Sequence, residues 1–155
     1  MHIGIESAAR EQIVQTLHHL LSDETVLHQQ TKTAHWNVTG GHFASAHALF
    51  EEQANTLATN IDEIAERIRM LNHHVEGNFA KLLPLTQLSA PDSKDQSLAA
   101  WAEALLNQHE MIIRTLRAII GHLSNTFQDH GTADFLTGVL RMHEKMAWIL
   151  RVSAQ

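Results

Sequence analysis

Two pairs of potential metal ligands lie in the middle of this 155-residue sequence. Each pair is spaced i, i+4: His47 with Glu51, and Asp62 with Glu66. On a helix, side chains four residues apart lie one above the other, so each pair can bind one ion. At about 100° per residue, the four side chains share one sector of a helix. Imidazole and carboxylate ligands together favour iron(II), manganese(II) or zinc over calcium.

The distance between the two pairs limits how they can act together. Fifteen residues separate His47 from Asp62, which corresponds to ~22 Å along a helix. One straight helix therefore cannot bring both pairs to the same ion. Two copies of the helix that cross antiparallel near Thr56 and Leu57 can, because the first pair of one copy then approaches the second pair of the other. The spacing predicts a site between two subunits.

His35 supplies one more candidate ligand. It precedes the turn at Gly40-Gly41, and this turn can fold it back beside His47. The completed cluster would hold two imidazoles and three carboxylates. The alternative is that each of these residues is an ordinary polar residue, and that the second pair forms, with Arg67, a solvated charged face of a helix.

Four long segments are expected to be the helices that position these residues. Apolar residues recur in them at spacings of three, four and seven, and clusters of glycine, proline and serine separate them. The segments are residues 6 to 37, 43 to 74, 96 to 123 and 132 to 152. A short helix is expected around residues 79 to 88, where Pro84 prevents a longer one. The sequence predicts one all-α domain over residues 1–155, a four-helix bundle with a long crossover between the second and third long helices.

Composition narrows the possible functions. The chain has no cysteine, which excludes disulfides, thiolate metal sites and cysteine nucleophiles. Its net charge is −6, and Arg10 is the only Lys or Arg among the first thirty residues, so no basic surface for nucleic acid or anionic lipid is expected. No signal-peptide pattern and no apolar run of ~18 residues is present. We expect a soluble cytoplasmic protein without a membrane partner, with the nucleoid as an alternative location.

Several motifs together resemble the Dps family of miniferritins, within the ferritin-like superfamily. The resemblance covers nearly the whole chain and is specific in its spacing. The motifs are Lys32 to Gly40 (KTAHWNVTG), then Phe43, His47 and Phe50, then Asp62 to Arg67 (DEIAER), and finally Thr132-Ala133-Asp134. This resemblance implies a ferritin-like four-helix subunit with a short extra helix in the long connection, assembled as a hollow homododecamer.

The resemblance also implies an activity, that of a ferroxidase. Such an enzyme oxidises iron(II), preferentially with hydrogen peroxide, and stores the ferric product as a mineral in the cavity, which protects the cell from oxidative damage. Each centre between subunits would take two irons, and zinc or manganese can substitute. By matching motif, His35, His47 and Glu51 come from one subunit and Asp62 and Glu66 from its partner. The family usually has Asp at the position of Glu51, so this chain departs from the pattern at the second metal position.

Further roles outside the centre follow from the same resemblance. Rings of carboxylates around three-fold axes are the family's usual route for iron uptake, and Asp129 and Asp134 are the candidates here. Helix capping is the alternative for both. Trp36 adjoins a ligand and can intercept stray oxidising equivalents, or else it simply packs at an interface.

DNA binding is the family's other activity, and it usually depends on a Lys-rich flexible terminus. The first ten residues here hold no Lys. We therefore expect weak or absent DNA binding at neutral pH, with a larger affinity in acid if the 13 histidines become charged. Most histidines outside the motifs are expected at surfaces or interfaces. The alternative to a ferroxidase is a non-enzymatic shell that sequesters metal or coats DNA without turnover.

Overall fold

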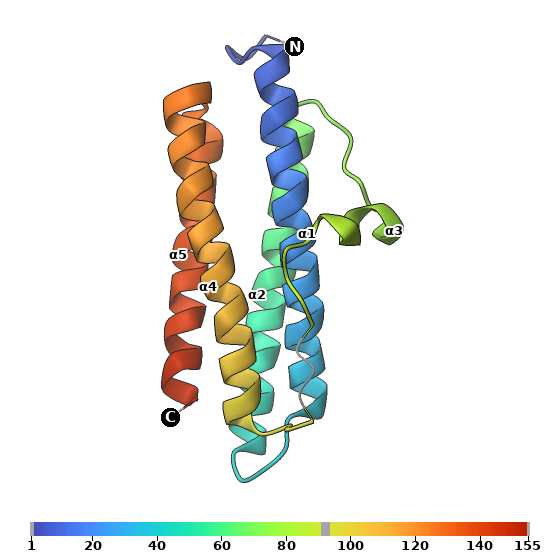
Figure 1. Ribbon diagram of the computed structural model, residues 1–155, viewed down its shortest axis with the longest axis vertical. Helices are drawn as coiled ribbons and strands as arrows, with labels where there is room; N and C mark the ends of the chain where they lie inside the picture. Colours follow the sequence, from blue (N-terminus) through green and yellow to red (C-terminus); the bar gives the residue numbers. More distant parts are fainter. Residues whose placement is uncertain (1, 91–93, 155) are drawn as a thin grey trace.

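Four long helices form an antiparallel bundle in the computed structural model, which describes residues 2–90 and 94–154 (Figure 1). The helices are α1 Ser7–Asn37, α2 Phe43–Met70, α4 Leu98–His122 and α5 His130–Ser153. The described residues contain no strand, only an isolated bridge between Thr39 and Ser97. The prediction of an all-α four-helix bundle is confirmed.

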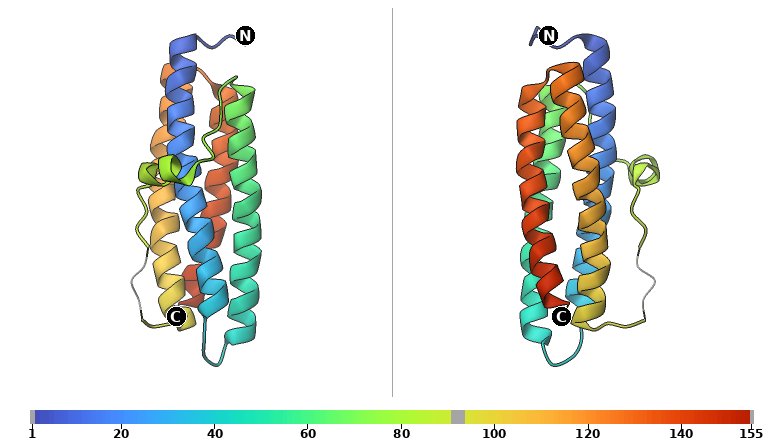
Figure 2. Two further views of the ribbon diagram at one scale, coloured as in Figure 1. Left: turned by 90° about the vertical axis from the view of Figure 1, so that its right-hand side faces the viewer. Right: turned by 60° about the vertical axis from the view of Figure 1, so that its left-hand side comes forward.

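The bundle is made of two helical hairpins. α1 packs along α2, and α4 packs along α5, whereas α2 and α5 meet at few positions (Figure 2). Thr39 N donates a hydrogen bond to Gln96 O at 2.9 Å and so ties the turn of the first hairpin to the start of the second. Among the described residues, no helix has the length and apolar character needed to span a bilayer.

The predicted crossover is present. Residues 71–90 pass along the outside of α1, where they form the short helix α3 Phe79–Leu82 and the single turn η1 Leu83–Leu85 (Figure 2). Pro84 lies in the first turn of η1, where its missing N–H costs nothing. The helical part therefore ends at residue 85, three residues before the predicted end at 88.

Two neighbouring residues of α1 hold this crossover in place. Ser22 Oγ donates to Leu82 O at 2.8 Å. One carboxylate oxygen of Asp23 accepts hydrogen bonds from Thr86 Oγ1 at 2.7 Å and from Gln87 N at 2.8 Å. Burial raises the pKa of Asp23, although both hydrogen bonds oppose that shift. The short helix is thus fixed by buried polar contacts as well as by packing.

Two helix boundaries differ from the prediction for local reasons. α2 ends at Met70 rather than at residue 74, because Asn72 adopts the left-handed φ of 63° that stops a helix. α5 begins at His130 rather than at residue 132, because Asp129 is its N-cap and accepts a hydrogen bond from Thr132 N at 2.9 Å.

The apolar core fixes the rotation of α2 about its axis. Phe50, Leu57 and Ile64 recur every seven residues and are fully buried. Each such side chain contributes roughly 1.5–3 kcal/mol by leaving water. Because these residues face the core, Asp62 and Glu66 lie on the exposed side of the same helix. The hydrophobic pattern therefore determines where the candidate ligands project.

Candidate metal centre

His35 and His47 form a tightly paired unit across the turn between α1 and α2. The ring centroids are 3.7 Å apart, and the rings are stacked. His35 Nδ1 lies 2.9 Å from His47 O, and His47 Nδ1 lies 2.8 Å from His35 O. His35 is buried and His47 is half-buried. We call these two residues the turn pair.

These reciprocal hydrogen bonds determine where each ring carries its proton. A carbonyl oxygen only accepts, so both Nδ1 atoms must be donors. In the neutral ring, Nε2 then keeps its lone pair, which is the form of histidine that binds a metal ion. The turn pair thus offers two imidazole nitrogens whose tautomer and orientation are already fixed by the backbone.

The three carboxylates of the predicted site are solvent-exposed on α2. Glu51 lies one helical turn after His47, while Asp62 lies about two-thirds of the way along the helix, ~22 Å from His47, and Glu66 lies one turn beyond it. Within one subunit, the described residues bring no three His, Cys, Asp or Glu side chains together around a point that can hold a metal ion. The subunit therefore pairs the two histidines but leaves Asp62 and Glu66 apart from them.

Two aromatic side chains flank the turn pair differently. The ring of Phe43 stacks on His47 with centroids 5.2 Å apart, which limits the movement of that imidazole. Trp36 is 59% exposed, and the ammonium of Lys32 lies 5.9 Å from its ring centroid. In the isolated subunit, Trp36 is therefore on the surface beside the ligands.

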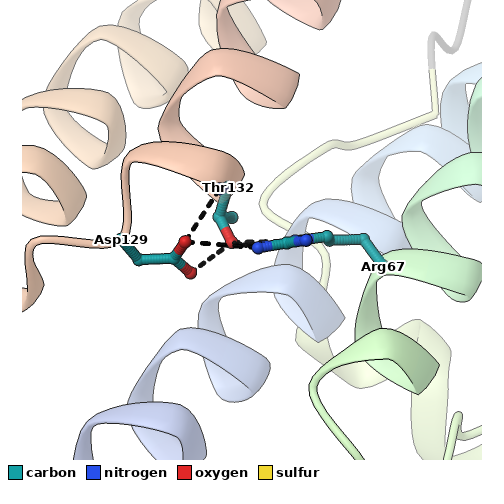
Figure 3. Close-up of polar contacts among 3 residues, drawn as sticks. All are labelled: Arg67, Asp129 and Thr132. Atoms are coloured by element: carbon teal, nitrogen blue, oxygen red, sulfur yellow. Dashed lines mark hydrogen bonds and ion pairs between the residues drawn. The ribbon is translucent and has the colours of Figure 1, made fainter. Parts of the chain in front are cut away.

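Asp129 takes part in a closed network that we call the Arg67–Asp129–Thr132 cluster (Figure 3). Arg67 Nε and Nη2 donate to Thr132 Oγ1 at 2.9 and 2.8 Å, and Nη2 also donates to Asp129 Oδ1 at 3.2 Å. The hydroxyl of Thr132 donates to the other oxygen of Asp129. The Asp129 side chain is 3% exposed. Asp129 is thus a buried helix cap, the alternative to a role in the pore.

Asp134 lies one turn further along α5 and is exposed. It lines a groove of about 730 Å³ between α2 and α5, together with Glu63 and the half-buried Phe135. An exposed carboxylate at this position remains available to a cation. Of the two pore candidates, Asp134 alone keeps a free surface position.

A second histidine pair lies in the bundle core. His143 Nε2 is 2.6 Å from Glu24 Oε1, and His143 Nδ1 is 2.8 Å from His109 Nδ1. All three side chains are 0% exposed. His109 and His143 are therefore exceptions to the expectation that most histidines outside the motifs lie at surfaces or interfaces. We call Glu24, His109 and His143 the core cluster.

The core cluster carries an electrostatic cost. Burial, and to a smaller extent the neighbouring His143, hold the pKa of His109 well below its usual range. Two further polar atoms, Glu24 Oε2 and His109 Nε2, are buried without a hydrogen-bond partner among the described residues. Spacing alone contained a hint of this arrangement, since His109 falls on the same apolar stripe as Leu105, Ile112 and Leu116.

Comparisons with known proteins agree with this architecture. Residues 14–153 match the Ferritin-like domain family. A low temperature-induced protein of Nostoc sp. is 38% identical over 97% of this chain and 84% of its own length. A DNA protection during starvation protein of Bacillus anthracis is 30% identical over 91% of this chain and 95% of its own length.

Solved structures show the same fold. The crystal structure of a Dps protein from Vibrio cholerae, described as a member of a broad superfamily of ferritin-like diiron-carboxylate proteins, has a TM-score of 0.92. It is 26% identical to this chain, with coverage of 100% of this chain and 96% of that one. The likeness thus extends through the crossover and both helical hairpins.

Proposed function

This chain belongs to the Dps family of ferritin-like proteins, and from that premise we propose that it is a ferroxidase that stores iron. It oxidises iron(II) at a centre between two subunits and keeps the ferric product as a mineral inside a hollow homododecamer. This activity protects the cytoplasm from the oxidative damage that free iron(II) and peroxide cause together.

One observation carries the proposal: two half-sites on a single exposed helix face. The turn pair presents two Nε2 atoms beside Glu51, and Asp62 with Glu66 lies ~22 Å away on the same helix. Neither half-site alone supplies all the ligands of the proposed two-iron centre. An antiparallel crossing of two α2 helices near Thr56 brings the first half of one copy to the second half of the other, and symmetry repeats the pairing.

Each residue then has a stated part in binding the substrate iron. Asp62 and Glu66 of one subunit bind the first ion and partly neutralise its charge, and His35 of the other binds it through Nε2. His47 and Glu51 hold the second ion. Because Glu51 is longer than the usual aspartate, we expect the second ion to be bound more weakly. Zinc and manganese(II) suit the same nitrogen and oxygen ligands.

Two adjacent irons explain a preference for hydrogen peroxide. Each iron(II) gives one electron, so the pair reduces one peroxide to two waters, with two protons taken up. The O–O bond is cleaved without release of a hydroxyl radical, which a single iron would produce by one-electron transfer. Trp36, exposed beside His35, is placed to take up oxidising equivalents that escape.

Iron uptake and DNA binding complete the proposal. We assign Asp134 to a carboxylate ring at the uptake pore, because it is exposed in the first turns of α5.

With a net charge of −6 and no Lys in its first ten residues, the chain should bind DNA weakly or not at all at neutral pH. A gel-shift assay at pH ~7.5 and moderate salt tests this point, and tight retention of DNA would contradict it.

Stopped-flow iron oxidation tests the central proposal. Peroxide is added to the assembled protein loaded with iron(II), and the ferric absorbance is followed. A His35→Ala, Asp62→Ala double variant that still assembles should lose the fast phase. Full retention of the rate would refute the assigned centre, and slow oxidation in the unaltered protein would favour the shell that sequesters metal without turnover.

A further inference from the structure

The side-chain hydrogen bonds of the Arg67–Asp129–Thr132 cluster all run between its own three residues in the part of the chain that the structure describes. The hydroxyl of Thr132 accepts two N–H groups from Arg67 and donates its own proton to Asp129. Asp129 Oδ1 also accepts from Thr132 N. Nε and Nη2 of Arg67 converge on one oxygen, Thr132 Oγ1, while Nη2 also reaches Asp129, an arrangement that the single nitrogen of a lysine cannot reproduce. The cluster therefore acts on the protein itself.

The cluster joins the two hairpins where they otherwise meet least. α2 and α5 meet at few positions, and residues 52–63 of α2 and 134–142 of α5 line a groove. Among the residues that the structure describes, the side-chain hydrogen bonds that connect α2 to α5 and its N-cap are those of Arg67. Arg67 thus forms the polar connection between α2 and α5.

Arg67 directly follows Glu66 on α2. Its contacts with α5 can therefore affect the position of Glu66 at the proposed metal centre. Successive side chains on a helix are about 100° apart, so Arg67 faces α5 while Glu66 faces outward. A rotation of α2 by ~10° moves a side-chain tip ~6 Å from the axis by ~1 Å. Metal–ligand distances in proteins fall within about 0.2 Å of their standard values, so a shift of this size would change the geometry of the site.

We propose that Arg67 is a positioning residue: by holding Asp129 and Thr132, it fixes the rotation of α2 where Asp62 and Glu66 project toward the metal. This inference rests on the proposed function, since it assumes that these two carboxylates are ligands. It assigns to Arg67 an effect on metal affinity and geometry beyond its effect on stability.

The turn before α5 is shaped to admit the guanidinium. A Cβ at Gly131 would lie 3.2 Å from Arg67 Nη2, closer than most such contacts allow. Gln128 has a left-handed φ of 53°, which turns the chain sharply just before the N-cap. Gly131→Ala therefore offers an independent way to displace the guanidinium without removing any of its hydrogen-bonding partners.

Cobalt(II) binding to the assembled protein tests the proposal without turnover. Arg67→Gln should raise the dissociation constant for cobalt(II) at least ~10-fold, the usual effect of losing a residue that orients a ligand. It should also change the visible absorption spectrum of the bound ion. Arg67→Lys should fall between Gln and the unaltered protein, and Gly131→Ala should change the spectrum in the same direction as Gln.

The matched control is Arg117→Gln. Arg117 forms an exposed ion pair with Glu144 between α4 and α5, far in sequence from the ligands. This variant should leave both the cobalt(II) affinity and the spectrum unchanged. If Arg67→Gln does not assemble, Thr132→Val replaces it, because it removes the accepting hydroxyl while keeping the side-chain volume.

These measurements distinguish failure of the positioning role of Arg67 from failure of the proposed metal centre. If Asp62→Ala abolishes cobalt(II) binding but the Arg67 and Thr132 variants bind with unchanged affinity and spectrum, the positioning role is overturned, whatever their melting temperatures. If Asp62→Ala itself leaves cobalt(II) binding intact, the proposed centre is wrong and this inference falls with it.

Discussion

The turn pair and the two histidines of the core cluster, His109 and His143 (the core pair), use the same type of side chain for opposite purposes. In the turn pair, His35 and His47 donate from Nδ1 to backbone carbonyls, at 2.9 and 2.8 Å, which leaves the lone pair of the neutral ring on Nε2. In the core pair, the Nδ1 atoms of His109 and His143 face each other at 2.8 Å, and His143 Nε2 contacts Glu24. One pair keeps a lone pair on each Nε2 for a metal ion, whereas the other directs its contacts into the core, where His109 Nε2 has no hydrogen-bond partner among the described residues.

This difference shows that the hydrogen-bond partner, rather than histidine itself, decides the role. A backbone carbonyl accepts from Nδ1 of His35 without adding charge and leaves Nε2 as the nitrogen that can bind a metal ion. The carboxylate of Glu24 adds charge to the core, where removing charged groups from water is costly. We therefore expect changes in the core pair to act on stability and changes in the turn pair to act on metal binding.

The largest expected effect is that of Glu24→Ala on stability. Removing one partner of a buried pair leaves the other polar group unsatisfied, which costs about 3–5 kcal/mol in the free energy of unfolding. Denaturant unfolding followed by circular dichroism measures this loss. Glu110→Ala is the control, because Glu110 pairs with Arg151 at 2.8 Å on the exposed surface, where such pairs contribute less than ~1 kcal/mol. Equal losses in the two variants would contradict the assigned role of the core cluster.

Next in size is the effect of His35→Ala on iron oxidation. Loss of residues that merely orient ligands costs 10–100-fold in affinity or activity, so loss of a ligand should reduce the initial rate at least ~100-fold. The comparison variant is His109→Gln, whose rate per assembled shell should match the unaltered protein. The initial rates of the two variants are compared by stopped-flow absorbance on shells purified by size exclusion. A comparable fall in both variants would erase the distinction between the pairs.

Sequence spacing placed the candidate ligands His47, Glu51, Asp62 and Glu66 on one helix, α2, because periodicity is a local property. The i, i+4 pairs and the apolar residues between them lie on one helix, so their relative placement follows from helix geometry. The end of α2 was missed, since it depends on the left-handed conformation of Asn72. The N-cap contact of Asp129 with Thr132 N is local and was stated as one of two alternatives, whereas its contact with Arg67, 62 residues away in the sequence, was not predicted.

The core cluster was beyond sequence analysis for a related reason. The contacts of His143 with His109 and with Glu24 join residues 34 and 119 positions apart in the chain. No local pattern encodes such a separation, and a histidine on an apolar stripe resembles one at an interface. The other half of the proposed metal centre lies on a second copy of the chain, which spacing can indicate but cannot place.

A smaller effect should appear in the pH dependence of stability. The pKa of His109 is lowered from 6.5 in the folded protein, so the unfolded chain binds its proton at higher pH. Stability is therefore fully present above about pH 6.5 and falls as the pH decreases toward the folded pKa, by at most ~1.4 kcal/mol per pH unit for one proton. His109→Gln should flatten the curve by up to that slope. Parallel curves from denaturant titrations would show that another group dominates.

The smallest effect concerns how firmly the turn pair is held. Phe43 stacks on His47 at 5.2 Å, and its removal should loosen that ring while both carbonyl hydrogen bonds remain. Aromatic pairs contribute about 1 kcal/mol, so Phe43→Ala should weaken cobalt(II) binding at the second position roughly fivefold. His42→Ala, an exposed residue of the same turn, is the matched control and should change nothing. If Phe43→Ala also binds normally, the two reciprocal hydrogen bonds alone orient the turn pair, and its rigidity comes from the backbone.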